Sequence, residues 1–499
     1  MSLVTKAGWR HFALIVLLAS VVRGGTLLAT HPSLTADPDG YREIARGLAL
    51  HGVFGLEAVD PSTGNPKAFP TAFRPPLYPW VLSWLADPQG HPTNAAIAIL
   101  HGLLGTVTVA GTYLIARRLL DKPPTDADAA TDGSSALNVP RRVQNASIFA
   151  AGLVAIDPLL LMSSSQVMTE TLAAALVVLA VGCWLPLTQT LQPDQARPLL
   201  TLIRHAGLLG LALGLAYLCR PTFILWPLGL SAYLGGLAVH RRSARPTIAA
   251  ATMLLVVAGF VAAWSARNHR HFGKPIWATT HGGYTLLLGN NPSFYEYLQT
   301  PGMLGRPWDP SSFFASWARR SEADPRDPAF WEQQPDRERE PAVSLPPPEP
   351  GAGGELADDR LAYQTAVATI RRDPVSFLHA CLWRLGRLHS PLPLRTQQRG
   401  SLGLIAVTTF YSVVLILILT GIWKLSWRLG TLPWVAPIAL WVALASVHTV
   451  YWTDMRMRAP AVPVLSILAA AAWLPRSPGA TGQPRRRSVL QSTDPTSAS

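Results

Sequence analysis

The sequence has few charged residues and few cysteines. Only 14% of its 499 residues are charged, whereas a soluble domain usually carries about 25%, so a large aqueous surface is excluded. Its three cysteines, Cys183, Cys219 and Cys381, lie far apart in the chain. This spacing excludes a disulfide framework and a cysteine-based metal site.

The sequence also lacks a nucleotide-binding motif. It contains no P-loop and no glycine-rich fingerprint after a strand, so nothing in it favours a nucleotide as substrate. It contains no internal sequence repeat with the period that is typical of solenoid proteins. It also lacks the pair of related halves that many transporters have, which argues against a transporter built on internal symmetry.

Long apolar segments dominate what is present. Hydrophobic residues make up 49% of the chain, and apolar segments recur at about 20 residues, the length that crosses a bilayer. We predict an all-α polytopic membrane protein with about ten transmembrane helices. The first is a retained anchor, because no Ala-x-Ala-like cleavage site follows it. The expected spans are 10–30, 94–118, 145–162, 168–187, 203–220, 222–239, 246–265, 402–423, 432–450 and 459–475.

The positive charges predict the orientation of these spans. The formal net charge is +13, and if the N-terminus is cytoplasmic, clusters of Lys and Arg fall on cytoplasmic segments, as the positive-inside rule requires. This distribution explains the basic character of the chain without nucleic acid as a partner. It predicts a multi-pass protein of the plasma (inner) membrane with its active site on the extracytoplasmic side. The loops 119–144, 188–202 and 240–245 would be cytoplasmic.

Two long segments then face outward and divide the chain. A transmembrane catalytic module covers residues 1–265 and includes the first outer loop, 31–93. Residues 266–401 form an outer loop region. C-terminal transmembrane helices cover 402–475, and residues 476–499 form a disordered cytoplasmic tail.

The outer loop region has a distinct composition. Thirteen of the 29 acidic residues lie between Glu296 and Asp359. Apolar positions at three- and four-residue spacing predict helix over 357–390, whereas the proline- and glycine-rich stretch 346–354 predicts a flexible excursion. The cytoplasmic insert 121–140 is polar and rich in small residues, which predicts disorder.

The first outer loop carries the leading candidates for catalysis. The segment YREIARGLALHG forms an amphipathic helix in this interpretation, and its apolar face can lie on the membrane surface. Asp37 would then be held at the interface, four residues before Tyr41. Asp39 is the competing carboxylate. The alternative for both is a solvated turn, because DPDG is a turn-forming sequence.

Arg74 begins the segment RPPLYP, which also contains Tyr78. The two prolines restrict the backbone around Arg74 and present it on a stiff support. A guanidinium offers forked donors that suit phosphate oxygens. The alternative is a proline-rich start of a short interfacial helix, with Arg74 reaching to water.

Ionisable residues also occur at the outer ends of later spans. Glu170 begins the fourth span, where an ionisable residue is a functional candidate or else a carboxylate that the helix dipole stabilises. Arg220 lies in LCRPTF, between two spans with almost no loop. It would contact either a lipid headgroup or the substrate.

Further cations gather at the same interface. The segment WSARNHRHFGKP contains Arg267, together with His269 and His271. The two histidines lack a third ligand at a suitable spacing, so we assign no metal ligand, although a role for a divalent metal stays open. Arg456 and Arg458, in WTDMRMRAP, lie outside against the positive-inside trend, which suggests an anionic partner.

These motifs together resemble those of the polyprenyl-phosphate-sugar-dependent glycosyltransferases of the GT-C fold. This group includes dolichyl-phosphate-mannose protein mannosyltransferases and bacterial lipid A aminoarabinose transferases. The D-x-x-x-Y spacing from Asp37, the segment RPPLYP and the segment MRMRAPAVP are similar to motifs of this group. Two positions differ, because Arg74 stands where the aminoarabinose transferases have Lys and Met457 replaces a Tyr.

The resemblance implies a GT-C-like bundle with an outer amphipathic-helix loop and a second outer loop domain. It implies that Asp37 is the catalytic carboxylate, that Glu170 is a second acidic residue in the same cavity, and that Arg74 contacts the carrier phosphate. The substrate-binding candidates are Arg74, Tyr41, Tyr78, Arg220, Arg267, Arg456 and Arg458.

The sequence therefore predicts an inverting glycosyltransferase that moves a sugar from a polyprenyl-monophosphate carrier to an acceptor hydroxyl of a lipid, glycan or protein. The phosphate departs as an anion, so the reaction needs a carboxylate base and cations that stabilise the phosphate charge. Two alternatives stay open. The first alternative is a transporter or lipid flippase. The second is a glycan ligase or polymerase that uses a diphosphate carrier.

Overall fold

The computed structural model describes residues 6–60, 62–121, 133–193, 197–300, 307–332, 352–393 and 401–475. Within these ranges the fold is helical apart from one two-stranded sheet. The tail 476–499 and most of the stretches 121–140 and 346–354 lie outside the described residues. Helices begin at Gly133 and at Ala352, so helix extends further into both stretches than their composition suggested.

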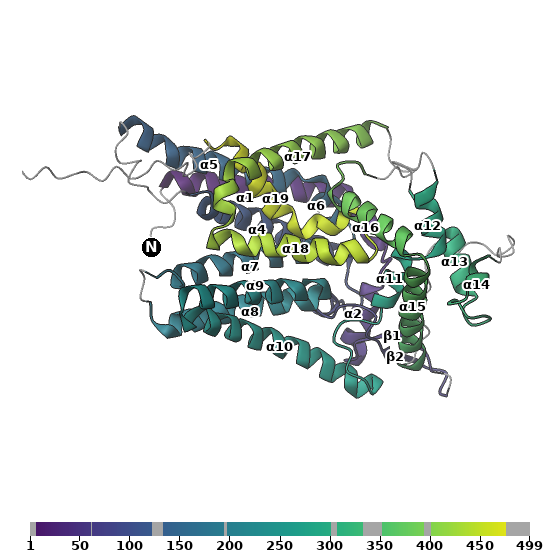
Figure 1. Cartoon of the computed structure of the whole chain (residues 1–499). Coiled ribbons are helices and arrows are strands. Elements are labelled where there is room, and N and C mark those ends of the chain that lie inside the picture. The colour runs from purple at the N-terminus through teal and green to yellow at the C-terminus, as the bar shows by residue number, and fades with distance from the viewer. Residues whose placement is uncertain are drawn as a thin grey trace, which may run out of the picture.

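Membrane-spanning helices form the body of the molecule (Figure 1). The described residues contain nine helices that are long and apolar enough to cross a membrane, or ten if a pair that meets at a 47° bend counts as one span. The prediction of an all-α polytopic protein with about ten spans is therefore confirmed. Seven of the spans are α1 (Lys6–Ala29), α4 (Asn94–Leu120), the bent pair α5 (Gly133–Ile156) and α6 (Pro158–Ser164), α7 (Glu170–Thr190), α8 (Leu199–Cys219), α10 (Ala244–Phe272) and α17 (Ser401–Leu429). The other three join an α-helix to adjoining 3-10 helices: Pro221–Arg241 contains α9 (Leu225–Arg241), Leu432–Val450 contains α18 (Val435–Val450), and Met455–Trp473 contains α19 (Val462–Ala470).

The bend between α5 and α6 follows from the sequence Asp157-Pro158. Proline has no N–H to donate and disfavours helix at the residue before it, so α5 ends at Ile156. The Asp157 carboxylate then accepts hydrogen bonds from the N–H groups of Leu159 and Leu160, at 3.0 and 2.9 Å, and caps α6.

The spans differ in how much of their surface they bury. In α7, 78% of the most apolar window is buried, whereas the corresponding value for α17 is 6%. Helix α7 is thus the centre of the bundle and α17 is at its edge. Close contacts between neighbouring spans use glycine, as membrane helices often do. At Gly214 of α8, for example, a Cβ would lie 2.2 Å from the Phe260 ring of α10.

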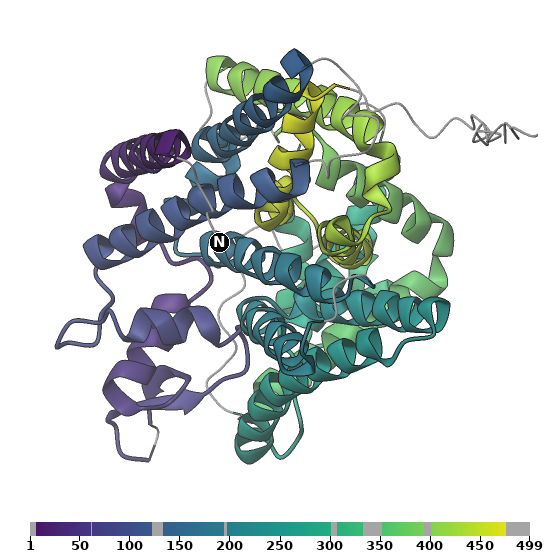
Figure 2. The ribbon, with the colours of Figure 1, turned by 90° about the vertical axis from the view of Figure 1, so that its left-hand side faces the viewer.

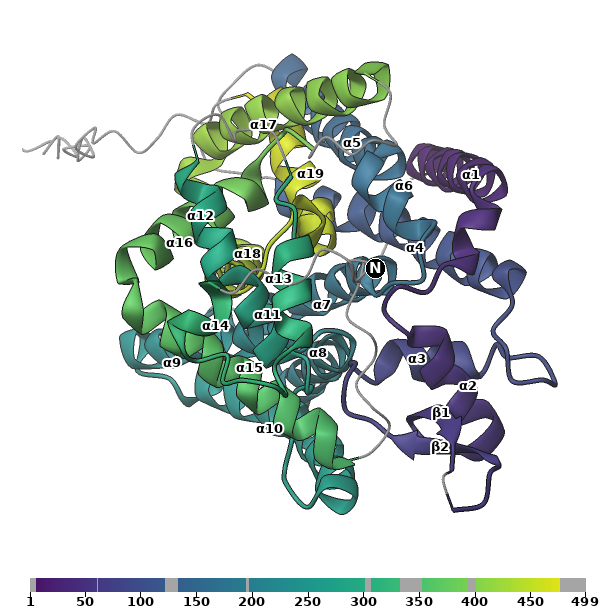
Figure 3. The same cartoon turned by 90° about the vertical axis from the view of Figure 1, so that its right-hand side faces the viewer.

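The remaining elements gather at one end of the bundle, which we call the outer end (Figures 1 and 3). Figure 2 views the spans from the opposite end. The first outer segment contributes α2 (Tyr41–His51), the antiparallel hairpin β1 (Gly55–Val59) with β2 (Pro66–Pro70), and α3 (Leu77–Ser83). The second contributes α11 (Gly282–Gly289), α12 (Pro292–Gln299), α13 (Ser311–Ala318), α14 (Pro328–Glu332), α15 (Ala352–Arg372) and α16 (Pro374–His389). The predicted helical stretch 357–390 is divided between α15 and α16, because Pro374 starts a new helix that Asp373 caps.

Helix α2 is amphipathic as predicted, but its apolar face does not lie on the membrane. Ile44 and Ala45 are fully buried, and Ile44 packs in a cluster with Phe54, Ala72 and Trp264. The apolar face is therefore covered by the loop after β2 and by α10. This packing fixes α2, and with it the preceding turn, to the rigid bundle.

Candidate functional site

Ionisable side chains from four separate segments meet at the outer end of the bundle. The first pair comes from the first outer segment. Arg74 Nη2 lies 2.8 Å from Asp39 Oδ1, and Arg74 Nε donates to the Asp39 carbonyl at 2.9 Å. The guanidinium also lies 4.4 Å from the Phe73 ring centroid and 5.7 Å from that of Tyr41. Arg74 is therefore held on three sides while its side chain keeps 12% of its surface exposed.

The second pair joins the start of α7 to the end of α8. Glu170 is 5% exposed, and its Oε1 lies 3.4 Å from Arg220 Nη1. Among the described residues this buried nitrogen has no hydrogen-bond partner. The other terminal nitrogen of Arg220, Nη2, lies 3.1 Å from Met457 Sδ. Arg220 thus retains hydrogen-bonding capacity that the protein does not satisfy, which is costly for a buried group.

Arg456 connects the two pairs. It lies in the 3-10 helix η4 (Met455–Ala461) that precedes α19. Its guanidinium interacts electrostatically with both Glu170 and Asp39, and its Nη1 lies 3.1 Å from Met168 Sδ. We call Asp39, Arg74, Glu170, Arg220 and Arg456 the outer cluster. Three guanidinium groups meet in this cluster, and guanidinium groups form strong, charge-assisted hydrogen bonds with anions such as phosphate.

Two tyrosines line the outer cluster. The rings of Tyr41 and Tyr78 meet edge to face with centroids 5.2 Å apart, and the Tyr78 hydroxyl pairs with His101 Nε2 at 2.9 Å. Burial raises the pKa of Tyr41 above its ordinary value, with a further rise from Asp39 that Arg74 partly opposes. Tyr41 is therefore a neutral hydroxyl in the electric field of the cluster.

Asp37 lies beside the outer cluster but has different partners from Asp39. Its two carboxylate oxygens accept hydrogen bonds from the backbone N–H groups of Tyr41 and Arg42, at 3.0 and 2.7 Å. The carboxylate therefore binds the N-terminus of α2, where the helix dipole favours negative charge. Burial raises the pKa of Asp37 above 3.8, and the charge of Asp39 raises it further, although the two N–H groups oppose both effects.

Two of the substrate-binding candidates lie outside the outer cluster. Arg267 donates to the carbonyl oxygens of Thr71 and Phe54, at 2.7 and 2.5 Å. Arg458 donates to the carbonyl oxygens of Leu388 and Ser390 at 3.1 and 2.8 Å. The structure thus brings together Arg74, Tyr41, Tyr78, Arg220 and Arg456, but it gives Arg267 and Arg458 backbone partners elsewhere.

Sequence reasoning missed Glu355, which connects the two outer segments. It is 5% exposed, and its carboxylate accepts hydrogen bonds from the Thr71 hydroxyl at 2.8 Å, the Ala72 N–H at 2.9 Å and the Thr280 hydroxyl. Since Thr71 and Ala72 directly precede Phe73 and Arg74, Glu355 fixes the position of Arg74. Glu355 belongs to the acidic stretch of the outer region, and its spacing gave no signal of this role.

We expect Glu355→Ala to lower the free energy of unfolding by about 1–3 kcal/mol, because buried donors would lose a charged acceptor. The purified protein in detergent should therefore show a lower midpoint of thermal unfolding than the wild type. Glu296→Ala is the matched control, since Glu296 is an exposed acidic residue of the same outer region. Equal midpoints for both variants would mean that Glu355 does not stabilise the contact between the segments.

The arrangement has no obvious metal site. Among the described residues no group of three or more His, Cys, Asp or Glu side chains could hold a metal ion. The groups that the outer cluster offers for chemistry are carboxylates and guanidinium groups. The former can accept a proton and the latter can bind an anion.

Comparisons with known proteins identify the fold. No protein-family model matches the sequence, and no curated protein matches it. The structure is similar to the oligosaccharyltransferase AglB from Archaeoglobus fulgidus in complex with an inhibitory peptide and a dolichol-phosphate. The TM-score is 0.50 and the identity 15%, over 94% of this chain and 50% of AglB. The apo form of the A. fulgidus enzyme gives a TM-score of 0.50 and 14% identity, over 92% of this chain and 50% of that one.

A weaker similarity is to ArnT from Cupriavidus metallidurans bound to undecaprenyl phosphate. Its TM-score is 0.38 and its identity 18%, over 91% of this chain and 78% of ArnT. The chain spans about half the length of AglB. The expected GT-C-like membrane fold is thus confirmed by the AglB comparison.

Proposed function

We propose that the protein is an inverting glycosyltransferase that transfers a sugar from a polyprenyl-monophosphate carrier to an acceptor hydroxyl. The observation that carries this proposal is the outer cluster. Arg74, Arg220 and Arg456 converge where the spans end, which is the depth at which a lipid-linked phosphate presents its head group. The likeness of the fold to AglB supports the proposal, since that AglB structure is a complex with a dolichol-phosphate.

The proposed reaction uses Asp37 as general base. Its carboxylate takes the proton from the acceptor hydroxyl, whose oxygen bonds to the anomeric carbon as the bond from that carbon to the phosphate oxygen breaks. The carrier phosphate leaves as an anion, so no general acid is needed. Displacement in a single step inverts the configuration of the anomeric carbon.

The choice of Asp37 over Asp39 rests on their partners. Asp39 is neutralised by the guanidinium of Arg74, whereas Asp37 is bound by backbone N–H groups. Burial, which raises the pKa of Asp37, makes its carboxylate a stronger base than an exposed aspartate. Asp39 would instead orient Arg74 toward the substrate.

The arginines of the outer cluster stabilise the leaving group in the proposed reaction. Arg74, Arg220 and Arg456 stabilise the negative charge that grows on the departing phosphate, and their positions are fixed before the substrate arrives. Glu170 holds Arg220 at 3.4 Å. In the free enzyme, Asp39 and Glu170 therefore pair with the arginines that would bind the phosphate oxygens of the donor.

The test is the dependence of transfer on the donor. The purified protein in proteoliposomes receives undecaprenyl-phosphate-linked sugars, one at a time, together with a mixture of lipid, glycan and peptide acceptors. We expect a labelled sugar to move to a hydroxyl from at least one of these donors. Transport of the intact donor without transfer would support the flippase alternative, and transfer only from diphosphate carriers would support the ligase alternative.

The proposed topology places the outer cluster on the extracytoplasmic face. We expect cysteines at Ser62, in the hairpin loop, and at Ser344, which lies outside the described residues, to react with an impermeant maleimide in intact cells. A cysteine at Gln192, an exposed position after α7, should react only after permeabilisation. The opposite pattern would place the cluster in the cytoplasm and exclude an extracytoplasmic reaction.

A further inference from the structure

A buried histidine without hydrogen bonds lies at the outer end of α18. His448 is 4% exposed and belongs to the last turn of this helix. Among the described residues it is the only one with two buried, unpartnered polar side-chain atoms, its two ring nitrogens. The ring lies close to the Trp452 backbone, but no hydrogen bond of acceptable geometry joins them. Burial of an unpaired polar group is costly, so the position of His448 points to a partner that the chain does not supply.

Arg220 is a neighbour of His448 and has the same deficit. The two side chains interact electrostatically, and the 3-10 helix η2 (Pro221–Ile224), which directly follows Arg220, packs against α18. Within the described ranges Arg220 Nη1 is buried without a hydrogen-bond partner, although it lies 3.4 Å from Glu170 Oε1. Two neighbouring groups that can donate hydrogen bonds therefore lack an acceptor.

Two hydroxyl groups near the ion pair of Glu170 and Arg220 are also unpaired. Thr222 lies two positions after Arg220, and Thr171 directly follows Glu170 at the start of α7. Neither buried hydroxyl has a hydrogen-bond partner among the residues that the structure describes. Unsatisfied polar groups thus occur at the outer ends of α7, α8 and α18 alike.

An anion is the ligand that these groups suit. Arg220 supplies a guanidinium, the His448 imidazole offers at least one N–H in either protonation state, and a threonine hydroxyl can donate as well. A phosphate has several acceptor oxygens, and charge-assisted hydrogen bonds to them are strong. The outer ends of the spans are also the depth at which a lipid-linked phosphate lies.

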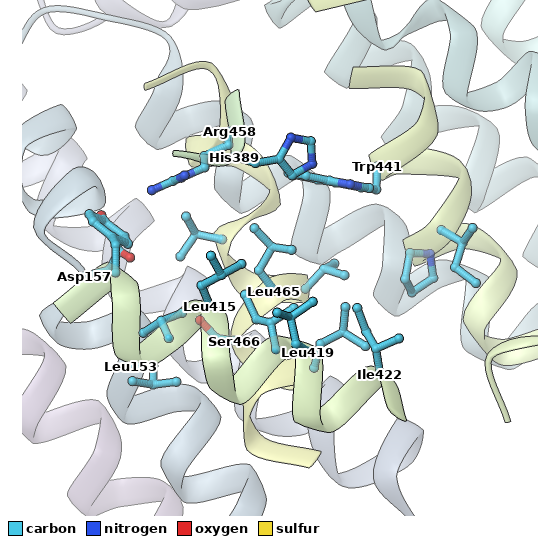
Figure 4. A pocket seen from close by; sticks show the side chains of 18 of the residues that line it. Leu153, Asp157, His389, Leu415, Leu419, Ile422, Trp441, Arg458, Leu465 and Ser466 are labelled. Carbon is cyan, nitrogen blue, oxygen red and sulfur yellow. The ribbon is translucent and has the colours of Figure 1, made fainter. Parts of the chain in front are cut away.

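The ionisable side chains of the other buried region at this level already have partners. This region is an apolar cavity lined by residues of α17, α18 and α19, with Asp157, Arg458 and His389 at its edge (Figure 4). Arg458 donates to two backbone carbonyls, and His389 Nδ1 pairs with a third at 2.7 Å. Asp157 accepts from the Tyr411 hydroxyl and from two N–H groups of α6. The unpaired donors that suit an anion therefore lie beside Arg220 and not at the edge of the cavity.

We infer that His448 is a further residue of the donor site and donates a hydrogen bond to the carrier phosphate beside Arg220. This inference rests on the proposed function, because it concerns the phosphate of the same donor. In the free enzyme the described chain gives neither His448 nor Arg220 Nη1 an acceptor, and the bound phosphate supplies one. His448 then acts in donor binding and in stabilisation of the leaving phosphate, whereas Asp37 deprotonates the acceptor.

The test is binding of undecaprenyl phosphate to the purified protein in detergent, measured by titration and native mass spectrometry. Undecaprenol, which lacks the phosphate, is the reference probe. His448→Phe keeps a ring but removes both nitrogens, so the Kd for undecaprenyl phosphate should rise about tenfold, as for loss of a hydrogen bond to a charged group. Binding of undecaprenol should not change. His448→Gln restores an N–H donor and should recover part of the affinity.

Thermal unfolding separates this role from a structural one. Because His448 has no partner in the described part of the free protein, His448→Phe should leave the midpoint of unfolding unchanged or raise it. His389→Phe is the matched control, since it makes the same change in a histidine that already has a partner. It should bind undecaprenyl phosphate as the wild type does.

Four results would overturn the inference. They are no binding of undecaprenyl phosphate by the wild type, wild-type affinity in His448→Phe, an equal loss of undecaprenol binding, and reduced binding together with a lower unfolding midpoint. A loss in His389→Phe alone would also overturn it, because the phosphate would then lie at the cavity edge. The proposed function fails separately. A protein that binds undecaprenyl phosphate through His448 but transfers no sugar keeps the phosphate site and loses the transferase, whereas transfer by His448→Phe with unchanged donor dependence refutes only the role of His448.

Discussion

Asp37→Asn is expected to reduce sugar transfer by about 10²–10⁴-fold, the usual contribution of a general base. The fold should survive, because asparagine is also a good acceptor at a helix N-terminus and its amide oxygen can replace one of the two hydrogen bonds that Asp37 accepts. The measurement is the initial rate of transfer in proteoliposomes. The midpoint of thermal unfolding of the same preparation checks the fold.

Asp39→Asn is the comparison variant for this experiment. It weakens the ion pair with Arg74 but leaves Asp37 intact, so its loss of rate should be smaller and should appear in donor affinity. The pH profile gives a second criterion. The base must be ionised, and since burial raises the pKa of Asp37, the wild-type rate should fall on acidification at a higher pH than an exposed aspartate would cause. Equal and severe losses in both variants would contradict the assignment of the base to Asp37.

Arg74→Ala is expected to reduce donor binding or transfer by about ten- to a hundredfold. A hydrogen bond to a charged group contributes roughly 1.5–3 kcal/mol, and a tenfold change corresponds to about 1.4 kcal/mol. Arg74→Lys should keep part of the activity, because it retains the charge but loses the forked geometry. The measurement is the transfer rate as a function of donor concentration.

Arg326→Ala is the matched control, since Arg326 is an exposed arginine of the outer region that pairs with Asp324 at 2.7 Å. It should transfer sugar at the wild-type rate. If Arg74→Ala also does so with unchanged donor dependence, the phosphate binds elsewhere. Arg220, whose buried Nη1 has no hydrogen-bond partner in the described part of the chain, would then be the leading candidate.

The membrane architecture could be predicted from the sequence because its signals are local. A run of apolar residues long enough to cross a bilayer specifies a span by itself. The break at Asp157-Pro158 was missed, because the expected span 145–162 ran through it without interruption. The proximity of Asp39, Glu170, Arg220 and Arg456 could be anticipated only coarsely. Glu170, Arg220 and Arg456 lie near the outer ends of spans and Asp39 lies in the first outer segment, so the topology predicted a common face but not which side chains pair.

The details that sequence reasoning missed depend on tertiary contacts. The pattern of apolar residues in α2 correctly predicted one apolar face, but it could not reveal that Phe54, Ala72 and Trp264 cover that face. Arg267 and Arg458 looked like ligands for an anion because they are outer cations. The folded chain gives both of them backbone carbonyl partners, which the sequence does not signal, and their role as substrate contacts stays a prediction.

The contact that Glu355 makes with the first outer segment limits how this protein can be recombined with a related one. Its bonds to Thr71 and Ala72 join residues that lie 284 and 283 positions apart in the chain, and its bond to Thr280 joins residues within the second outer segment. A chimera that received a foreign segment 31–93 alone would bring in the counterparts of Asp37 and Arg74 without the matching contact to Glu355. A chimera designed to exchange donor or acceptor preference with a related protein should therefore replace both outer segments, 31–93 and 266–401, at the same time.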